Sequence, residues 1–424
     1  MNFKKRKMIE IIDRRSFLMT TFAVLAGCKT GKKTEHSETA GKPGKNKNIQ
    51  PLKPNPSSKT EPVVKNEVPK ISSSSSEKIT VTKDQNVYFT RDLTPYGVMK
   101  VYKKISHHVR GKIGFKVHFG EDGNVTYIRP EMMKKLVKKL KANLVETNVL
   151  YVGKRRYTKS HIKLAKDHGF TFAPIDILDS EGDMELKVDY RHYKKIRIGK
   201  HTANYDMFVI FSHFKGHGSA GFGGAIKNVS MGLGSIAGKM AMHASTIPSY
   251  DPKKCISCGI CVKKCPASAI TLKPLKIDPK KCIGCAACIG ECPYRVFRVP
   301  FGTTAPKVFH ERLVEYAKAI SDYKPCVYIN VLANITRKCD CMGSPQKPFM
   351  DDIGILAGTD IVAMDQASLD LVNKKHNCND TFLKESNMSG NHQLAYAEKI
   401  GLGKRKYVMH DLDIERIPLK VEKK

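Results

Sequence analysis

Two regions with different hydrophobic patterns meet at about residue 80. Residues 29–80 contain few large apolar side chains and are rich in Lys, Pro, Thr, Glu and Ser, with five consecutive serines at 72–76. Because such a composition cannot bury a hydrophobic core, we expect these residues to form a disordered tether. From Val81 onward, short apolar runs alternate with amphipathic segments, and this pattern predicts an α/β fold.

The apolar runs and the helical spacing in the second region predict individual elements. About 340 residues follow the tether, which is enough for one large or two moderate α/β domains. Strands are expected at 114–119, 144–152, 206–212, 326–332 and 352–358. Helices are expected at 131–141, 160–168, 311–321 and through 367–372.

Two segments, 251–266 and 278–293, repeat one cysteine spacing 27 residues apart. Each contains C-x2-C-x2-C-x3-C-P, and a zinc site or a disulfide framework would leave the third cysteine, the fourth cysteine and the second copy unexplained. The spacing resembles that of bacterial two-cluster ferredoxins, in which the fourth cysteine of each segment binds the other cluster. The resemblance implies two 4Fe-4S clusters in a small inserted α+β domain. One would be held by Cys255, Cys258, Cys261 and Cys292, and the other by Cys282, Cys285, Cys288 and Cys265.

The N-terminal residues carry an arginine pair ahead of a short apolar run. Arg14 and Arg15 precede this run, which is followed by a Leu-Ala-Gly-Cys string that ends at Cys28. The pattern resembles a twin-arginine export signal with a lipobox, with departures from the usual residues at Asp13 and Met19. An uncleaved membrane anchor is the alternative, but about nine apolar residues are too few to span a bilayer. The resemblance implies export by the twin-arginine machinery, lipidation at Cys28 and anchoring on the extracytoplasmic side of a membrane, which is the periplasm in a diderm.

These two resemblances support each other. Iron-sulfur clusters are assembled in the cytoplasm, and the twin-arginine route carries folded, cofactor-loaded proteins. A general secretory route would instead expose eight unliganded cysteines to an oxidising compartment.

The chain is strongly basic. Its formal net charge is +34 at pH 7, of which residues 1–27 contribute +4. Lysines are spread along the whole chain and no nucleic-acid-binding motif accompanies them, so we do not expect a nucleic-acid partner. The charge instead favours attraction to anionic lipid headgroups or to an acidic redox partner protein.

Residues 212–228 combine glycines with basic side chains directly after a predicted strand. Backbone N–H groups of such a loop can approach an anion, and the side chains of His213, Lys215, His217 and Lys227, with Lys239 further along, can bind or protonate it. The segment matches neither the phosphate-loop nor the dinucleotide-binding fingerprint. The alternative is that the glycines permit tight packing of the loop and that the histidines have structural partners.

A second candidate is the pair Cys339 and Cys341. Cysteines two apart on an extended segment point to the same side, so both can bind one soft metal ion or lie beside a cluster. The alternatives are packed or partly oxidised thiols, or a disulfide from one of them to Cys326 or Cys378 in an exported protein. We expect a direct bond between Cys339 and Cys341 to be strained.

Several strings together resemble a known family, although none is specific alone. They are Ser-His-Phe-Lys-Gly-His at 212–217, Gly-Gly-Ala-Ile-Lys-Asn at 223–228, Cys-Asp-Cys at 339–341, Asp-Ile-Gly-Ile-Leu at 352–356 and Val-Ala-Met-Asp-Gln at 362–366. The combination resembles the bacterial and archaeal domain of unknown function number 362 over about residues 85–415. Members of that family often carry the same inserted double-cluster module, but the resemblance implies no established reaction or substrate.

These observations predict five segments. They are a signal peptide with a lipobox at 1–28, a tether at 29–80, the first part of the α/β domain at 81–249, a ferredoxin insert at 250–299 and the second part of the α/β domain at 300–424.

Our leading hypothesis is an exported, membrane-tethered iron-sulfur protein that passes single electrons through two 4Fe-4S clusters to or from a site on the α/β domain. That site would reduce a small anionic substrate, and a further metal ion would bind at Cys339 and Cys341. The first alternative is a pure electron carrier that docks a partner enzyme. The second is a metal-handling or structural iron-sulfur protein.

Replacing both Arg14 and Arg15 by lysine should block export while leaving the folded protein in the cytoplasm, because the twin-arginine machinery reads the arginine pair. Immunoblots of cytoplasmic and extracytoplasmic fractions would measure the change, with Lys4→Arg as the control. Unchanged export of the double variant would contradict the twin-arginine interpretation.

Overall fold

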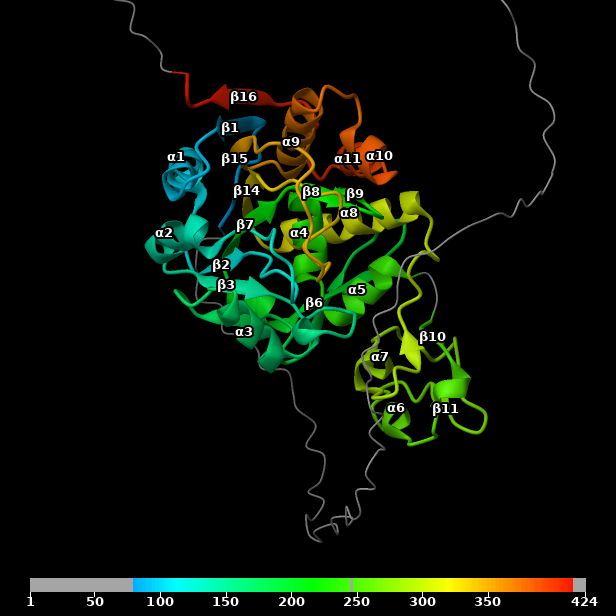
Figure 1. Ribbon diagram of the computed structural model, residues 1–424. Coiled ribbons are helices and arrows are strands. Elements are labelled where there is room, and N and C mark those ends of the chain that lie inside the picture. Colours follow the sequence, from blue (N-terminus) through cyan, green and yellow to red (C-terminus); the bar gives the residue numbers. More distant parts are fainter. Residues whose placement is uncertain (1–78, 245–246, 415–424) are drawn as a thin grey trace, which may run out of the picture. The chain divides into compact units, whose positions relative to one another are not determined.

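The computed structural model describes residues 79–244 and 247–414 (Figure 1). The predicted signal peptide, with Arg14, Arg15 and Cys28, and the predicted tether up to residue 78 lie outside the described residues. The described part is α/β, as the hydrophobic pattern predicts. Within it, no helix has both the length and the apolar character needed to cross a membrane.

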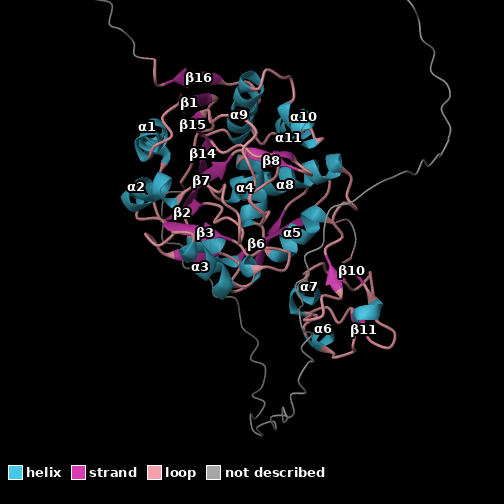
Figure 2. Cartoon of the chain, viewed as in Figure 1, coloured by secondary structure: helices cyan, strands magenta, loops and turns pink. Residues whose placement is uncertain are grey.

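An eight-stranded sheet forms the centre of the α/β part (Figure 2), in the order β16-β1-β15-β14-β7-β2-β3-β4. Neighbouring strands from β14 to β4 run parallel, whereas β15 is antiparallel to both β14 and β1. The strand bounds are β1 (Asn86–Thr90), β2 (Ile113–Lys116), β3 (Asn143–Glu146), β4 (Ile175–Ile177), β7 (Met207–His213), β14 (Cys326–Leu332), β15 (Gly354–Gly358) and β16 (Val408–Asp411).

Helices cover both faces of this sheet, and the side-chain alternation of the strands explains the two cores. Along β7, Phe208 and Ile210 pack into one apolar cluster, while Val209 and Phe211 pack into the other. The first cluster also contains buried side chains of α4 (Ala225–Leu233), α8 (Pro306–Tyr323), α9 (Ile361–Lys375), α10 (Thr381–Ser386) and α11 (Asn391–Lys399). The second contains those of α1 (Pro95–Ile105), α2 (Pro130–Leu140) and α3 (Thr158–Asp167).

Most predicted elements are present with shifted ends. The strand predicted at 326–332 coincides with β14, and the helices predicted at 131–141 and 311–321 correspond to α2 and α8. The strand predicted at 144–152 is wrong beyond Glu146, where the chain leaves the sheet and forms a buried loop. β1 and α1 are present although the hydrophobic pattern did not reveal them.

The order of the strands reverses between β2 and β7. Strands β3 and β4 follow β2 to one side, and β7 and β14 are added on its other side. In open parallel sheets, a crevice opens beyond the carboxyl ends of the strands at such a reversal. The last residues of β2, β3 and β7 are Lys116, Glu146 and His213.

Residues 249–298 form a small segment with an internal repeat. Its elements are β10 (Ser249–Tyr250), α6 (Ile260–Lys263), β11 (Ile270–Thr271), β12 (Lys276–Ile277), α7 (Ala287–Glu291) and β13 (Phe297–Arg298). Strand β10 pairs with β13 and β11 pairs with β12, so the two ends of the segment meet. Left-handed backbone conformations recur 27 residues apart, at Ser257 and Gly284 and again at Ser268 and Arg295. The two cysteine segments therefore have the same local fold.

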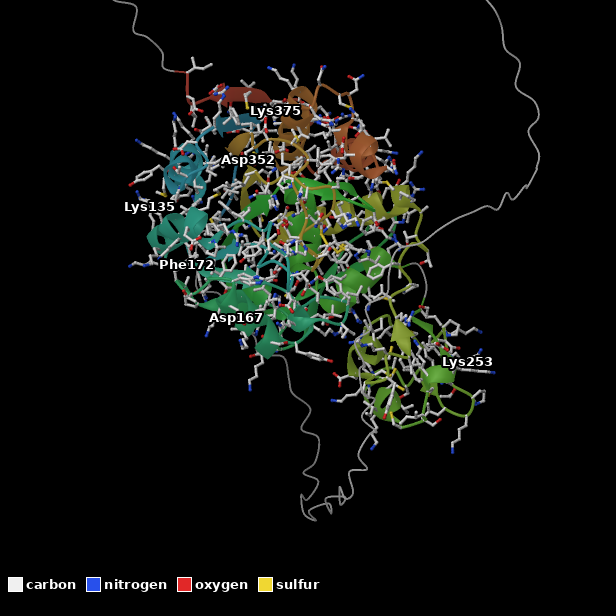
Figure 3. The ribbon with its side chains drawn as sticks, viewed as in Figure 1. Lys135, Asp167, Phe172, Lys253, Asp352 and Lys375 are labelled. Atoms are coloured by element: carbon white, nitrogen blue, oxygen red, sulfur yellow. A yellow bond between two sulfur atoms is a disulfide. The ribbon has the colours of Figure 1, made fainter. Side chains whose placement is uncertain are left out.

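Much of the positive charge lies at the surface. Figure 3 shows the exposed side chains of Lys135 and Lys253 directed away from the ribbon, and Lys375 is also exposed. Charges placed in this way are solvated and contribute little to stability.

The glycine-rich loop folds as a hairpin that immediately precedes α4 in the chain. Strands β8 (Lys215–His217) and β9 (Gly221–Gly223) pair antiparallel, as do β5 (Asp183–Lys187) and β6 (Lys195–Gly199) elsewhere in the chain. The helix α5 (Ile236–His243) follows α4.

At the start of α4, the N–H groups of Ala225 and Ile226 donate to the Asp365 carboxylate at 2.7 and 2.9 Å. The anion at this helix N-terminus therefore belongs to the protein itself.

Asp365→Ala should lower the free energy of unfolding by about 2 kcal/mol, because it leaves buried N–H donors without an acceptor. Urea denaturation followed by circular dichroism would measure the change. The control is Asp351→Ala, since the Asp351 side chain is 85% exposed. Equal midpoints for the two variants would contradict this role of Asp365.

Candidate functional site

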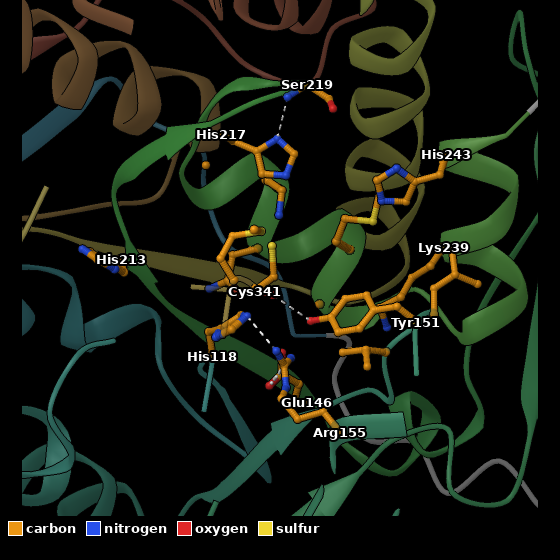
Figure 4. A pocket seen from close by; sticks show the side chains of 18 of the residues that line it. His118, Glu146, Tyr151, Arg155, His213, His217, Ser219, Lys239, His243 and Cys341 are labelled. Atoms are coloured by element: carbon orange, nitrogen blue, oxygen red, sulfur yellow. Dashed lines mark hydrogen bonds and ion pairs between the residues drawn. The ribbon is translucent and has the colours of Figure 1, made fainter. Parts of the chain in front are cut away.

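A cavity of about 460 Å³ lies beyond the carboxyl ends of β2, β3 and β7 (Figure 4). Its wall contains five basic residues and four histidines, while Glu146 is the one carboxylate that lines it among the described residues. The basic residues are Lys116, Arg155, Lys215, Lys227 and Lys239, and the histidines are His118, His213, His217 and His243. A cavity with this excess of positive charge is suited to a small anion.

A buried ion network forms one wall of the cavity. The Lys116 ammonium lies 3.4 Å from Glu146 Oε1, and Arg155 Nη2 lies 3.0 Å from Glu146 Oε2. Burial lowers the pKa of Lys116 to about 8, partly offset by Glu146. Burial alone would raise the pKa of Glu146, but Arg155 and Lys116 hold it well below its usual value. This carboxylate is therefore neutralised by its partners and does not repel an anion in the cavity.

Asp340 occupies a second buried ion cluster, at the end of β7. His213 Nδ1 lies 2.8 Å from Asp340 Oδ2, and the Lys215 ammonium lies 3.2 Å from the same oxygen. The other ring nitrogen of His213 faces the Ala333 carbonyl at 2.7 Å. Burial would raise the pKa of Asp340, but His213 and Lys215 hold it well below its usual range. Both nitrogens of His213 are thus engaged within the protein, so this residue positions Asp340.

His217 lies on the hairpin with its ring in the cavity (Figure 4). Its Nδ1 accepts hydrogen bonds from the backbone N–H groups of Ser219 and Ala220, at 3.2 and 3.0 Å. Burial lowers the pKa of His217 well below its ordinary value, and the charge of Lys227 adds to the effect. The ring is therefore neutral with its proton on Nε2, which makes that nitrogen a donor.

The two lysines on α4 and α5 differ in their partners. The Lys239 ammonium donates to the hydroxyl of Thr147 and to the carbonyls of Asn148 and Gly234. Lys227 has no hydrogen-bond or ion-pair partner for its ammonium within residues 79–244 and 247–414. Burial and the nearby Lys215 lower the pKa of Lys227 to about 7. Of these two lysines, Lys227 is therefore the one available to bind a ligand or transfer a proton.

The structure joins Cys339 and Cys341 in a disulfide, with their Cα atoms 5.3 Å apart. In this state neither sulfur is a thiolate, so the expected metal site would require both cysteines to be reduced. The disulfide also excludes the alternative pairings in this state, since Cys326 and Cys378 are free. Cys341 lines the cavity, and one ring nitrogen of His217 lies within 4.8 Å of both sulfurs.

Backbone contacts fix the segment that carries this disulfide. The N–H of Glu121 donates to the Asp340 carbonyl at 3.1 Å, and the Tyr151 hydroxyl lies 3.3 Å from the Cys341 carbonyl. On the hairpin side, the Gly216 N–H donates to the Thr336 carbonyl at 2.8 Å. A side chain at Gly216 would lie 2.4 Å from the Arg337 carbonyl oxygen, so glycine permits this close approach.

The eight cysteines of the repeated segments separate into two groups of four. They surround two small hollows, and all eight are free. One hollow is lined by Cys255, Cys258, Cys261 and Cys292, and the other by Cys265, Cys282, Cys285 and Cys288. These groups are the two interleaved sets that the resemblance to bacterial two-cluster ferredoxins implies.

The predicted anion-binding residues His213, Lys215, His217 and Lys227 all line one cavity. Lys116, Glu146 and Arg155 were not predicted from the sequence, and Asp340 had no predicted role. Lys116 and Glu146 carried a usable signal, since each is a charged residue within or at the end of an apolar strand.

A family model matches residues 113–370, which include the carboxyl ends of β2, β3 and β7, the hairpin and the Cys339–Cys341 segment. The chain belongs to the family Domain of unknown function (DUF362). The family resemblance stated from the sequence strings is thereby confirmed. No curated protein matches this DUF362 chain significantly.

Two solved structures have limited similarity to this DUF362 protein. The lactate racemase apoprotein from Thermoanaerobacterium thermosaccharolyticum is 14% identical, with a TM-score of 0.33, and the match covers 58% of this chain and 50% of that one. A Thermotoga maritima protein solved by a structural genomics consortium is 9% identical, with a TM-score of 0.35, and the match covers 66% of this chain and 58% of that one. The chain thus spans little more than half the length of these structures, and similarity at this level supports no inference about chemistry.

Acylation of Lys227 by trace acetic anhydride should rise steeply through pH 7, because the pKa of its ammonium is about 7 and only the neutral amine reacts. Peptide mass spectrometry between pH 5.5 and 9 would measure it, relative to the exposed Lys135. A constant ratio of Lys227 to Lys135 labelling across this range would contradict the prediction.

Proposed function

We propose that this chain is an exported, lipid-anchored iron-sulfur protein that exchanges single electrons between a redox partner protein and the basic cavity, where a small anionic substrate is reduced. Two 4Fe-4S clusters would be bound by the eight cysteines of the repeated segments and, when bound, would supply one-electron transfer.

The proposal rests chiefly on the grouping of the eight sulfurs. A cubane needs four thiolates around a space that excludes other side chains, and each group of four cysteines lines such a hollow. The surrounding side chains are mainly apolar, including Leu272 and Phe297 at one hollow and Ile270 and Ile277 at the other. Backbone N–H groups also reach the sulfurs, since Ala269 N donates to Cys265 Sγ at 3.3 Å. The residues present therefore fit the proposed groups.

Contacts between the repeated-cysteine segment and the loop after β3 support communication with the cavity. Leu150 lines the cavity and belongs to the same apolar cluster as Cys288. Arg156 Nη2 donates to the Ala286 carbonyl at 3.0 Å, and a side chain at Gly290 would collide with that guanidinium. Because Ala286 lines the hollow formed by Cys265, Cys282, Cys285 and Cys288, this hollow is in direct contact with the loop after β3.

The cavity residues account for the proposed choice of substrate. The basic side chains attract an anion, while the carboxylates of Glu146 and Asp340 are neutralised by their own partners. Lys227 can donate a proton to the reduced product and accept one from solvent near neutral pH. A small substrate would therefore find both charge compensation and a proton at the same wall.

The proposed location outside the cytoplasm rests on the arginine pair at Arg14 and Arg15 and on the lipobox that ends at Cys28. With a charge of +30 remaining after residue 27, the chain would be attracted to anionic headgroups and to an acidic partner. The same charge supports recognition of a redox protein by electrostatic steering.

Anaerobically purified protein should contain about eight irons and eight sulfides. Each cysteine-to-serine substitution should remove only the cluster that this cysteine binds. Cys261→Ser and Cys292→Ser should lose the same set of about four irons and the same electron paramagnetic resonance signal after dithionite reduction. Cys265→Ser and Cys288→Ser should lose the other.

Cys378→Ser is the matched control, because Cys378 is a free thiol outside both hollows. Its iron content should equal that of the unmodified protein. Tightly bound zinc in place of iron would contradict the proposal. A spectrum of Cys292→Ser that matches that of Cys288→Ser would contradict the interleaved assignment.

A further inference from the structure

We propose that Cys339 and Cys341 form a redox-active pair that alternates between disulfide and dithiol and reduces small anionic disulfides in the basic cavity. This inference rests on the proposed function only for its source of electrons. The cysteine pair, its neighbours and its chemistry can be tested without the clusters.

The two sulfurs differ in access, as the two members of a reactive pair must. Cys341 lines the cavity and also an adjoining open hollow beside Tyr151 and Lys154. Cys339 is 4% exposed and does not line the cavity. After reduction, Cys341 would therefore be the thiolate that attacks the substrate. The more buried Cys339 would then attack the mixed disulfide between Cys341 and the substrate.

His217 favours a thiolate at this position over a bound metal ion. A histidine that binds a metal donates its other ring N–H to an acceptor, which fixes the ligating tautomer. The Nδ1 of His217 instead accepts two backbone N–H bonds, so the proton must be on Nε2. One ring nitrogen of His217 lies within 4.8 Å of both sulfurs, so the ring stands beside the pair, and in this tautomer Nε2 carries a proton and has no lone pair for a metal.

The charges around the pair also favour the thiolate and an anionic substrate. Lys215 and Lys227 line the same cavity as Cys341, and positive charge stabilises a thiolate over a thiol. Asp340 lies between the two cysteines in sequence, but its carboxylate is bound by His213 and Lys215. Its negative charge therefore does not oppose that of the sulfur.

The backbone is held so that the two sulfurs would remain within reach after reduction. The N–H of Cys341 lies 3.2 Å from Cys339 Sγ, and the Asp340 carbonyl accepts a bond from Glu121. The Asn124 side chain donates to the Met342 carbonyl at 3.2 Å. Anchors on either side of the pair keep the segment in place when the bond between the sulfurs breaks.

The reaction balances in two stages. In the first, the Cys339–Cys341 disulfide takes up two electrons, one at a time, and two protons to give two thiols. In the second, the Cys341 thiolate attacks a substrate disulfide and releases one thiol, and Cys339 then displaces the second. The net change is one substrate disulfide reduced to two thiols for each protein disulfide formed.

The first test uses the full-length, cluster-loaded protein and reduced methyl viologen as a one-electron donor. After denaturation and alkylation with iodoacetamide, mass spectrometry should find the peptide with Cys339 and Cys341 unmodified before reduction and doubly alkylated afterwards. Dithiothreitol should give the same product. Cys326 should be alkylated in every sample, because it is free.

Two results would overturn the proposal. One is a peptide that stays unmodified after both reductants. The other is a pair already alkylated in the protein as purified, with about one metal ion per chain beyond the cluster iron that Cys339→Ser and Cys341→Ser each remove.

If the proposed electron transfer through the clusters is wrong, the alkylation results differ from those that would overturn the redox pair. In Cys288→Ser, viologen should no longer reduce the pair rapidly, while dithiothreitol still does. If the unmodified protein contains no iron but dithiothreitol forms the dithiol and the next test succeeds, the electron-transfer proposal fails and the redox pair stands.

The second test measures the substrate class with two small disulfides of similar size. The dithiol form should reduce dianionic 3,3′-dithiodipropionate about tenfold faster than neutral hydroxyethyl disulfide, because the basic cavity concentrates the anion. Lys227→Met should reduce this preference, whereas Lys135→Met should not. Equal rates for the two disulfides, or an unchanged rate in Cys341→Ser, would overturn the assignment.

Discussion

The arrangement of the cavity depends on the contacts of the Asp340 carboxylate with His213 and Lys215. A buried carboxylate is costly unless charged or hydrogen-bonded partners surround it, and these two residues lie 2.8 and 3.2 Å from the same oxygen. His213 ends β7, whereas Asp340 lies on a loop more than 120 residues later. Their pairing fixes both flanking cysteines beside the hairpin that carries His217.

The same edge of the sheet collects the other charged groups. Lys116 and Glu146 end β2 and β3, and Arg155 reaches Glu146 from the loop after β3. Each carboxylate has its own cationic partners, so the charges left over are positive. In this member of the DUF362 family, the cavity thus combines an excess of basic side chains, a lysine whose ammonium has no partner among the described residues, and a cysteine pair.

Features that depend on residues close together in the chain could be predicted from the sequence. The two interleaved sets of cysteines were implied by the resemblance of the repeated C-x2-C-x2-C-x3-C-P segments to bacterial two-cluster ferredoxins. Apolar runs located β14 and β7, and helical spacing located α2 and α8. The glycine-rich loop after β7 could be named as a candidate site because glycines and basic side chains alternate within it.

The other contacts of the cavity depend on side chains that are far apart in the sequence or lie on different elements. No spacing rule brings Asp365 to the start of α4, Asp340 to His213, or Arg155 to Glu146, since each pair joins different elements. The tautomer of His217 depends on two backbone N–H groups, and the bond between Cys339 and Cys341 depends on how their loop is anchored. The sequence by itself determined the α/β pattern and the sets of cysteines, because these follow from local periodicity and spacing. Only the tertiary structure decided which charges are neutralised and which remain available, because that depends on contacts between distant segments.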